Sequence, residues 1–158
     1  MNKFVLTFCA ALAILGSSCS SKDSSKAEDT SVSPKSESTI VAPIDSTGTV
    51  IELANKALIA PDMAVERLTI LDFNATWCGP CQQLAPVLSD LAKKYQGQVT
   101  FISIDVDRFP ALFESFKVGP YIPAVVICRP DGKQVKYTGT RELLPFESFD
   151  SIIQNNLK

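Results

Sequence analysis

The sequence predicts an α/β domain, a central mixed β-sheet flanked by helices, preceded by a disordered N-terminal tether. From residue 49 onward, short apolar runs typical of strands alternate with segments whose apolar residues recur at helical spacing. The turn signal Pro130-Asp131-Gly132 joins the last two strand patterns and predicts an antiparallel return, which makes the sheet mixed. A chain of 158 residues has room for one domain of ordinary size and one further segment.

Each expected element follows from a local pattern. Strands are predicted at 49–53, 68–73, 99–105, 124–128 and 133–138. The second of these strands is rich in Leu, Ile and Phe, as strands buried on both faces are. Helices are predicted at 78–95, at 109–116 and from Pro145 onward. Pro86 lies inside the first of these helices and predicts a kink.

Composition excludes several classes of function. The chain contains no histidine, which excludes Cys-His and Ser-His nucleophiles, histidine metal ligands and histidine pH switches. The formal net charge is -2, and the Lys and Arg residues are scattered instead of forming a basic stripe. We therefore expect no nucleic-acid partner.

The start of the chain is typical of an export signal. Lys3 precedes an apolar run that ends in small residues and is too short to span a membrane as a helix. Cys19 follows, in a setting that resembles the lipid-attachment site of bacterial lipoproteins, although Gly16 stands where a leucine is usual. We expect a signal peptide at 1–18 and a lipid on Cys19. Ordinary cleavage that releases a soluble periplasmic protein is the alternative.

The segment after Cys19 predicts a disordered linker. It is rich in Ser, Lys, Asp and Glu and poor in large apolar residues, so burial cannot offset its chain entropy. The expected organisation is therefore a lipid-attachment cysteine and linker at 19–46 and a folded domain at 47–158.

Cys78 and Cys81 form a closely spaced pair that follows an apolar strand and opens a predicted helix. A Cys-x-x-Cys pair in this setting indicates a redox site, because the helix dipole and free amides stabilise the thiolate of the first cysteine. A zinc site or a static structural disulfide is the alternative. Tetrahedral zinc needs a second pair of ligands, and only Cys128 remains in the domain. Cys128 itself is expected to be a small buried apolar residue.

The stretch Trp77-Cys78-Gly79-Pro80-Cys81 resembles the active site of the thioredoxin family, and the spacing of the other elements extends the resemblance over the whole predicted domain. It implies a thioredoxin fold and a thiol-disulfide oxidoreductase that needs no cofactor. Cys78 would be the exposed nucleophile, and Cys81 would resolve the mixed disulfide. Trp77, Gly79 and Pro80 would contact substrate, with Trp77 either covering the cysteine or filling the core.

The resemblance also identifies Asp72 with the family's buried aspartate. In an apolar strand its carboxyl should be desolvated and its pKa raised, which suits a base that takes the proton of Cys81, although a purely structural aspartate is the alternative. Two departures from the family alter its surroundings. Ser103 stands where many thioredoxins have a lysine, and Asn74 replaces a frequent aromatic residue.

Further resemblances outline a substrate groove. Pro123 matches the cis-proline that faces the disulfide and would hold the backbone of Ile122 against a bound peptide. Gly139 matches the glycine that borders this groove. The stretch before Pro123 is one residue longer than usual and contains Pro120, which could compete for the cis role.

The resemblance implies an enzyme that reduces or exchanges disulfides of exported proteins in the cell envelope. No Gly-x-Gly-x-x-Gly fingerprint is present, so electrons are expected from a donor protein, by resemblance a membrane thiol conductor. We expect a monomer held at the membrane through Cys19. The alternatives are an oxidase or isomerase, and a peptide-binding module without turnover.

Overall fold

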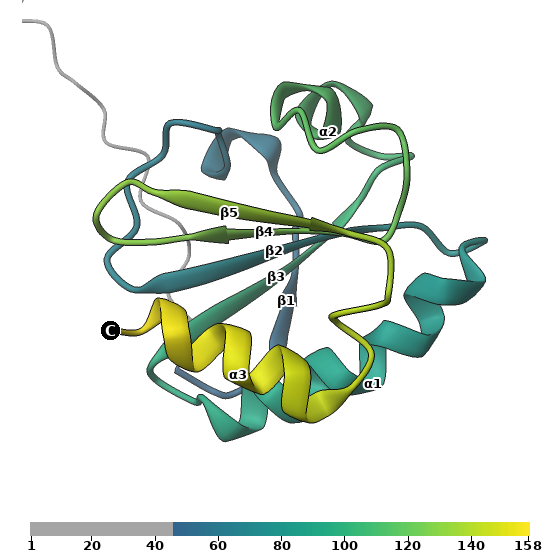
Figure 1. The fold of residues 1–158 in the computed structure, drawn as a ribbon. Helices are drawn as coiled ribbons and strands as arrows, with labels where there is room; N and C mark the ends of the chain where they lie inside the picture. Colours follow the sequence, from purple (N-terminus) through teal and green to yellow (C-terminus); the bar gives the residue numbers. More distant parts are fainter. Residues whose placement is uncertain (1–45) are drawn as a thin grey trace, which may run out of the picture. The chain divides into compact units, whose positions relative to one another are not determined.

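A computed structural model of the chain describes residues 46–158, in which five strands form one sheet in the order β1-β3-β2-β4-β5 (Figure 1). The strands are β1 (Val50–Glu52), β2 (Leu68–Asn74), β3 (Val99–Asp105), β4 (Ala124–Cys128) and β5 (Gln134–Thr138). β3 pairs in parallel with β1 and β2, whereas β4 runs antiparallel to both β2 and β5. The predicted mixed sheet is confirmed.

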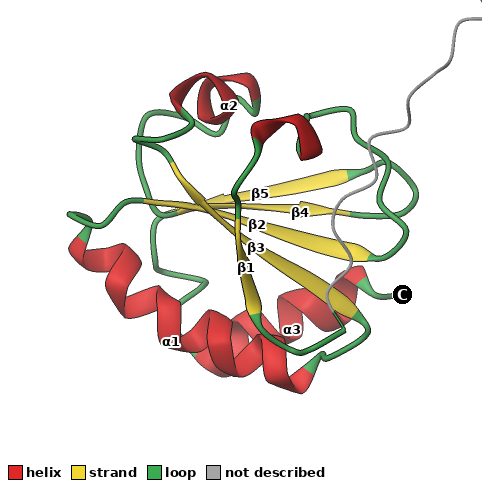
Figure 2. Cartoon of the chain, turned by 180° about the vertical axis from the view of Figure 1, so that it is seen from behind, coloured by secondary structure: helices red, strands yellow, loops and turns green. Residues whose placement is uncertain are grey.

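Helices cover both faces of this sheet (Figure 2). They are α1 (Gly79–Lys94), α2 (Pro110–Ser115) and α3 (Phe146–Asn156), with a short 3-10 helix η1 (Lys56–Leu58). α1 and α3 lie together on one face, and α2 lies on the other. The sheet is thus the middle of three layers.

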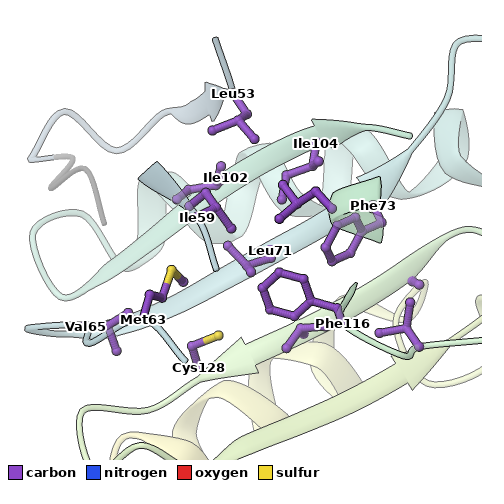
Figure 3. Close-up of a cluster of buried hydrophobic side chains, with 14 residues drawn as sticks. Leu53, Ile59, Met63, Val65, Leu71, Phe73, Ile102, Ile104, Phe116 and Cys128 are labelled. Atoms are coloured by element: carbon purple, nitrogen blue, oxygen red, sulfur yellow. The ribbon is translucent and has the colours of Figure 1, made fainter. Parts of the chain in front are cut away.

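The alternation of side chains along β2 divides the core in two. Ile70 packs in a cluster with apolar residues of α1 and α3. Leu71 and Phe73 point to the opposite face and pack with Phe116 at the end of α2, in the cluster drawn in Figure 3. Because side chains alternate along a strand, Asp72 shares the face of Ile70 and is directed toward α1.

The expected elements are all found, with bounds that differ by one residue where they differ. The short helix η1 was not predicted, and its start is held by Asn55, whose side chain accepts a hydrogen bond from the amide of Ala57. α1 continues through Pro86 as a single helix. Between residues 46 and 158, no helix combines the length and the apolar character that a membrane crossing requires. The expected signal, Cys19 and linker lie outside the described residues.

Candidate active site

Cys78 and Cys81 form a disulfide where the loop after β2 enters α1. Cys78 is the N-cap of the helix, and its Sγ accepts a hydrogen bond from the amide of Cys81 at 3.2 Å. The first amides of a helix have no partner within the helix and carry the positive end of its dipole. The sulfur of Cys78 therefore occupies the place where a thiolate is stabilised.

The loop that carries Cys78 is held by its own backbone and by α1. The amide of Cys78 donates to the carbonyl of Ala75 at 3.1 Å, and the side chain of Gln82 donates to the carbonyl of Thr76 at 2.7 Å. Pro80 lies in the first turn of the helix, where its missing N–H leaves no hydrogen bond unmade. The sequence thus fixes the loop locally.

Exposure does not distinguish the two cysteines in the disulfide form. Cys78 exposes 5 % of its surface and Cys81 exposes 6 %, so the expectation of an exposed Cys78 is wrong for this form. Ala75 packs with the pair, and Val106 and Ile122 pack against that cluster. What sets Cys78 apart is its position as the helix cap.

The Ile122–Pro123 peptide bond is cis, and Pro120 does not take that role. The amide of Gly139 donates to the carbonyl of Pro123 at 2.8 Å. Gly139 has a φ of +83°, which glycine adopts without strain, and a side chain at this point would project into open space. Ile122 thus packs against the cluster of the disulfide, the cis-proline follows it in the chain, and Gly139 is hydrogen-bonded to that proline.

Two aromatic side chains flank this region and face solvent. Trp77 is 67 % exposed, so the interpretation that it fills the core is wrong. Its Nε1 donates to Asp107 Oδ2 at 2.7 Å, which holds the ring on the surface next to Cys78. Tyr121 is 72 % exposed and directly precedes Ile122. Neither Asp107 nor Tyr121 was singled out in the sequence, since a partner across loops leaves no local signal.

Asp72 is buried, with 7 % of its surface exposed. Burial raises its pKa from 3.8 to about 7, the hydrogen bond from Asn74 opposes that rise, and the negative charge of Glu52 adds to it. The raised pKa agrees with the expectation from an apolar strand. A carboxyl with this pKa can both accept and release a proton near neutral pH.

A polar cluster surrounds this carboxyl. The Asn74 side-chain amide donates to Asp72 Oδ2 at 2.9 Å and to Ser103 Oγ at 2.9 Å. Asp72 Oδ1 has no hydrogen-bond partner among residues 46–158. Asp72, Asn74, Ser103 and Cys81 all line one hollow of about 420 Å³, which lies beside α1. Cys81 and the carboxyl of Asp72 thus border the same space.

The cluster was only partly visible in the sequence. Asn74 is two residues after Asp72, and residues two apart in a strand lie on the same face. The sequence alone therefore places Asn74 beside Asp72. Ser103 lies opposite Asp72 in the parallel register of β2 and β3. The family resemblance places Ser103 near Asp72, although neither strand by itself specifies that register. Cys128 is free and buried as expected, and burial raises the pKa of its thiol to about 11.

Known proteins of one family resemble this chain. The Thioredoxin family model matches residues 51–152. A thioredoxin of Staphylococcus saprophyticus is 37% identical over 91 residues, which are 57% of this chain and 83% of that protein. Thioredoxin-1 of Drosophila melanogaster is 37% identical over 81 residues, which are 51% of this chain and 75% of that protein.

Solved structures give the same result. Chloroplastic thioredoxin z superimposes with a TM-score of 0.59 at 29% sequence identity. The match covers 68% of this chain and 93% of the thioredoxin z chain. A thioredoxin variant from Halobacterium salinarum gives a TM-score of 0.59 at 26% identity, over 73% of this chain and 97% of its own. Since the family match spans both the sheet and the cysteine pair, this chain belongs to the thioredoxin family and is a thiol-disulfide oxidoreductase.

Proposed function

We propose that this protein reduces or exchanges disulfides of exported proteins on the periplasmic side of the cell envelope, with Cys78 and Cys81 as its redox pair. The observation that carries the chemistry is a disulfide formed by the cap of a helix and a cysteine in its first turn. Ile122, which packs against that disulfide and is followed by a cis-proline, supports a protein substrate bound through its backbone.

The reaction begins with the reduced protein. The Cys78 thiolate attacks one sulfur of the substrate disulfide, a mixed disulfide forms, and the other substrate sulfur leaves with the electron pair of the broken bond. Cys81 then gives its proton to Asp72 and attacks Cys78. The bond between Cys78 and the substrate breaks, and the Cys78–Cys81 disulfide closes. The substrate gains two electrons and, from solvent, two protons.

The binding surface is proposed from the residues around the disulfide. Ile122 packs against the cysteine pair, and its backbone would pair with a substrate chain, for which Gly139 leaves open space. Trp77 and Tyr121 offer exposed rings for apolar side chains of the substrate. Gly79 has no atom close to the position of a side chain, so a peptide can approach the helix start.

The direction proposed is reduction. The dipeptide Gly79-Pro80 resembles that of thioredoxin, whose potential is about -270 mV, against about -120 mV for the strong periplasmic oxidant of the same fold. Pro80 contributes no amide toward Cys78, so the thiolate is less stabilised and the reduced form gives up its electrons more readily. We expect a potential below about -220 mV in glutathione equilibration. A value above about -180 mV would instead indicate oxidation or isomerisation.

Turnover is tested by reduction of insulin with dithiothreitol as the electron source. Wild type should accelerate the reaction, and Cys78→Ser should abolish the acceleration because no other thiol caps α1. Cys128→Ser is the matched control and should retain activity, since that thiol is buried apart from the pair. Peptide binding that survives Cys78→Ser, without turnover in wild type, would indicate a binding module.

Location is tested separately. We propose that a lipid on Cys19 anchors the protein and that a membrane thiol conductor reduces it, because the sequence before the domain is typical of an exported lipoprotein. Cys19→Ser should move the protein from the membrane to the soluble envelope fraction and abolish fatty-acid labelling. Equal membrane association of both proteins would contradict the anchor. Trapping with Cys81→Ser would identify substrates and the donor.

A further inference from the structure

The amide of Asn74 is held by two strands at once. Asn74 ends β2, and its Nδ2 donates to Asp72 Oδ2 at 2.9 Å and to Ser103 Oγ of β3 at 2.9 Å. It also lies 3.2 Å from the backbone oxygen of Asp72. With acceptors on both strands, the amide has one favourable orientation.

This contact makes the two oxygens of the Asp72 carboxyl different. Oδ2 accepts from Asn74, whereas Oδ1 has no partner among the described residues. Asp72 and Cys81 line the same hollow of about 420 Å³. Oδ1 is buried and has no partner among the described residues, so its lone pairs are free to accept a proton from Cys81, which borders the same hollow.

The charge of the surroundings favours a proton carrier. In the part of the chain that the structure describes, the neutral amide of Asn74 is the hydrogen-bond donor to this carboxyl. Glu52 of β1 and Lys93 of α1 also line the hollow, and Lys93 pairs with Asp90 at 3.1 Å. A neutral donor stabilises a carboxylate less than a paired cation does, so the carboxyl is able to take up a proton near neutral pH.

We propose that Asn74 is a positioning residue for proton transfer, whose amide holds Oδ2 of Asp72 so that Oδ1 receives the proton of Cys81. The inference rests on the proposed role of Asp72 as the base. In this step the S–H bond of Cys81 breaks and an O–H bond forms at Oδ1, directly or through water in the hollow. The sulfur of Cys81 then bonds to Cys78, the substrate sulfur leaves, and Asp72 returns its proton to solvent.

The test measures resolution alone. Reduced full-length protein, with Cys9 and Cys19 replaced by serine, is mixed with a fluorescent peptide disulfide. One half of this probe stays on Cys78 until Cys81 resolves the bond, so fluorescence anisotropy reports that step. The rate is measured from pH 5 to pH 9 for wild type and for Asn74→Leu, which keeps a similar volume and removes the donor. Gln98→Leu, an exposed amide outside the hollow, is the control.

Loss of the donor should raise the pKa of Asp72, because the Asn74 hydrogen bond lowers it. The midpoint of the pH profile should move up by about one pH unit, with resolution about tenfold slower at pH 6. The rates should converge at pH 9, where the carboxyl is ionised in both proteins. Asn74→Gln, which restores an amide, should recover part of the rate, and Gln98→Leu should match wild type.

A double variant separates positioning from structure. In an Asp72→Asn background, Asn74→Leu should have no further effect on resolution, because its effect passes through the carboxyl. If Asn74→Leu slows resolution equally in both backgrounds, the proposed role of Asn74 is overturned and that of Asp72 is not. The same holds if the pH profile of Asn74→Leu is not shifted although Asp72→Asn resolves slowly. A fast Asp72→Asn protein would overturn the base on which the inference rests. If Asn74→Leu does not fold, Asn74→Ala makes the same test, since it only removes atoms beside an existing hollow.

Discussion

Two buried aspartates on the α1 side of the sheet have opposite electrostatic settings. Asp72 exposes 7 % of its surface and Asp150 exposes 9 %. The pKa of Asp72 is raised to about 7, chiefly by burial, whereas the hydrogen bond from Lys94 holds the pKa of Asp150 below its ordinary value. Little surface of either carboxyl is exposed, but Asp72 lies deeper in the protein, so burial dominates its shift, whereas the cationic partner dominates that of Asp150.

The partners explain the difference in detail. Asp150, in α3, accepts hydrogen bonds from Lys94, from the hydroxyl of Tyr95 at 2.7 Å and from Gln154 at 2.8 Å. This carboxylate joins α3 to the end of α1 and stays charged. Asp72 receives only a neutral amide among the described residues, so its charge state can change during a reaction. One aspartate serves the fold, and the other is available for chemistry.

The largest expected effect is on stability at Asp72. In the unfolded chain this carboxyl ionises near its ordinary value of 3.8, and in the folded protein only near 7. As pH rises between these values, the unfolded state loses its proton first, so wild type loses stability until about pH 7 and the penalty is constant above it. At about 1.36 kcal/mol per pKa unit, the penalty is at most about 4 kcal/mol.

Asp72→Asn removes this penalty. The oxidised variant should unfold at a higher urea concentration than wild type at pH 8, and the two proteins should differ least near pH 4. Equilibrium unfolding at both pH values checks the prediction. A variant that is less stable than wild type at pH 8 would show that the charged carboxylate supports the fold, as Asp150 does.

Asp150→Asn should have the opposite effect. Loss of the charge weakens three hydrogen bonds and should destabilise the protein by about 1–3 kcal/mol at pH 7. Because the pKa of Asp150 is lowered on folding, its contribution is present above the unfolded value of 3.8 and is lost as pH falls through the folded pKa. Urea unfolding at pH 7 and pH 3 measures the loss of stability and its dependence on pH.

Asp90→Asn is the control for this variant. It affects an exposed ion pair with Lys93 and should change stability by less than about 0.5 kcal/mol.

The contrast between these aspartates also shows how far the sequence predicts the molecule. The strands at 99–105 and 124–128 match the prediction in both bounds, because an apolar run between turn signals is a local property. The raised pKa of Asp72 follows from its strand for the same reason. The partners of Asp150 are not local: Tyr95 lies 55 positions away and meets it only when α1 and α3 pack on one face of the sheet.

The active site follows the same division. The cysteine pair and the capping of α1 are encoded within a few residues, and so they could be predicted. The burial of Cys78 depends on Val106 and Ile122, which arrive from two other segments. The link from Asn74 to Ser103 depends on the register between β2 and β3. Features that need two distant segments at one point could not be predicted from local sequence patterns alone.

A smaller effect than the loss of either buried aspartate is expected when Asp72 is given a cationic partner like that of Asp150. Ser103→Lys places an ammonium group in the hollow that Asp72 and Glu52 both line, and that hollow has room for the longer side chain. A cation nearby favours the carboxylate, so the pKa of Asp72 should fall by about 1. The pH midpoint of resolution should move down, and the plateau rate should fall, since a less basic carboxylate takes the Cys81 proton less readily.

Carboxyl-carbon NMR titration measures the pKa of Asp72, and stopped-flow measurement of mixed-disulfide resolution gives the rate. Ser103→Ala, which adds no charge, controls for the lost hydroxyl. An unchanged pKa with Ser103→Lys would mean that the partner's charge does not decide the state of Asp72, and that burial alone separates it from Asp150.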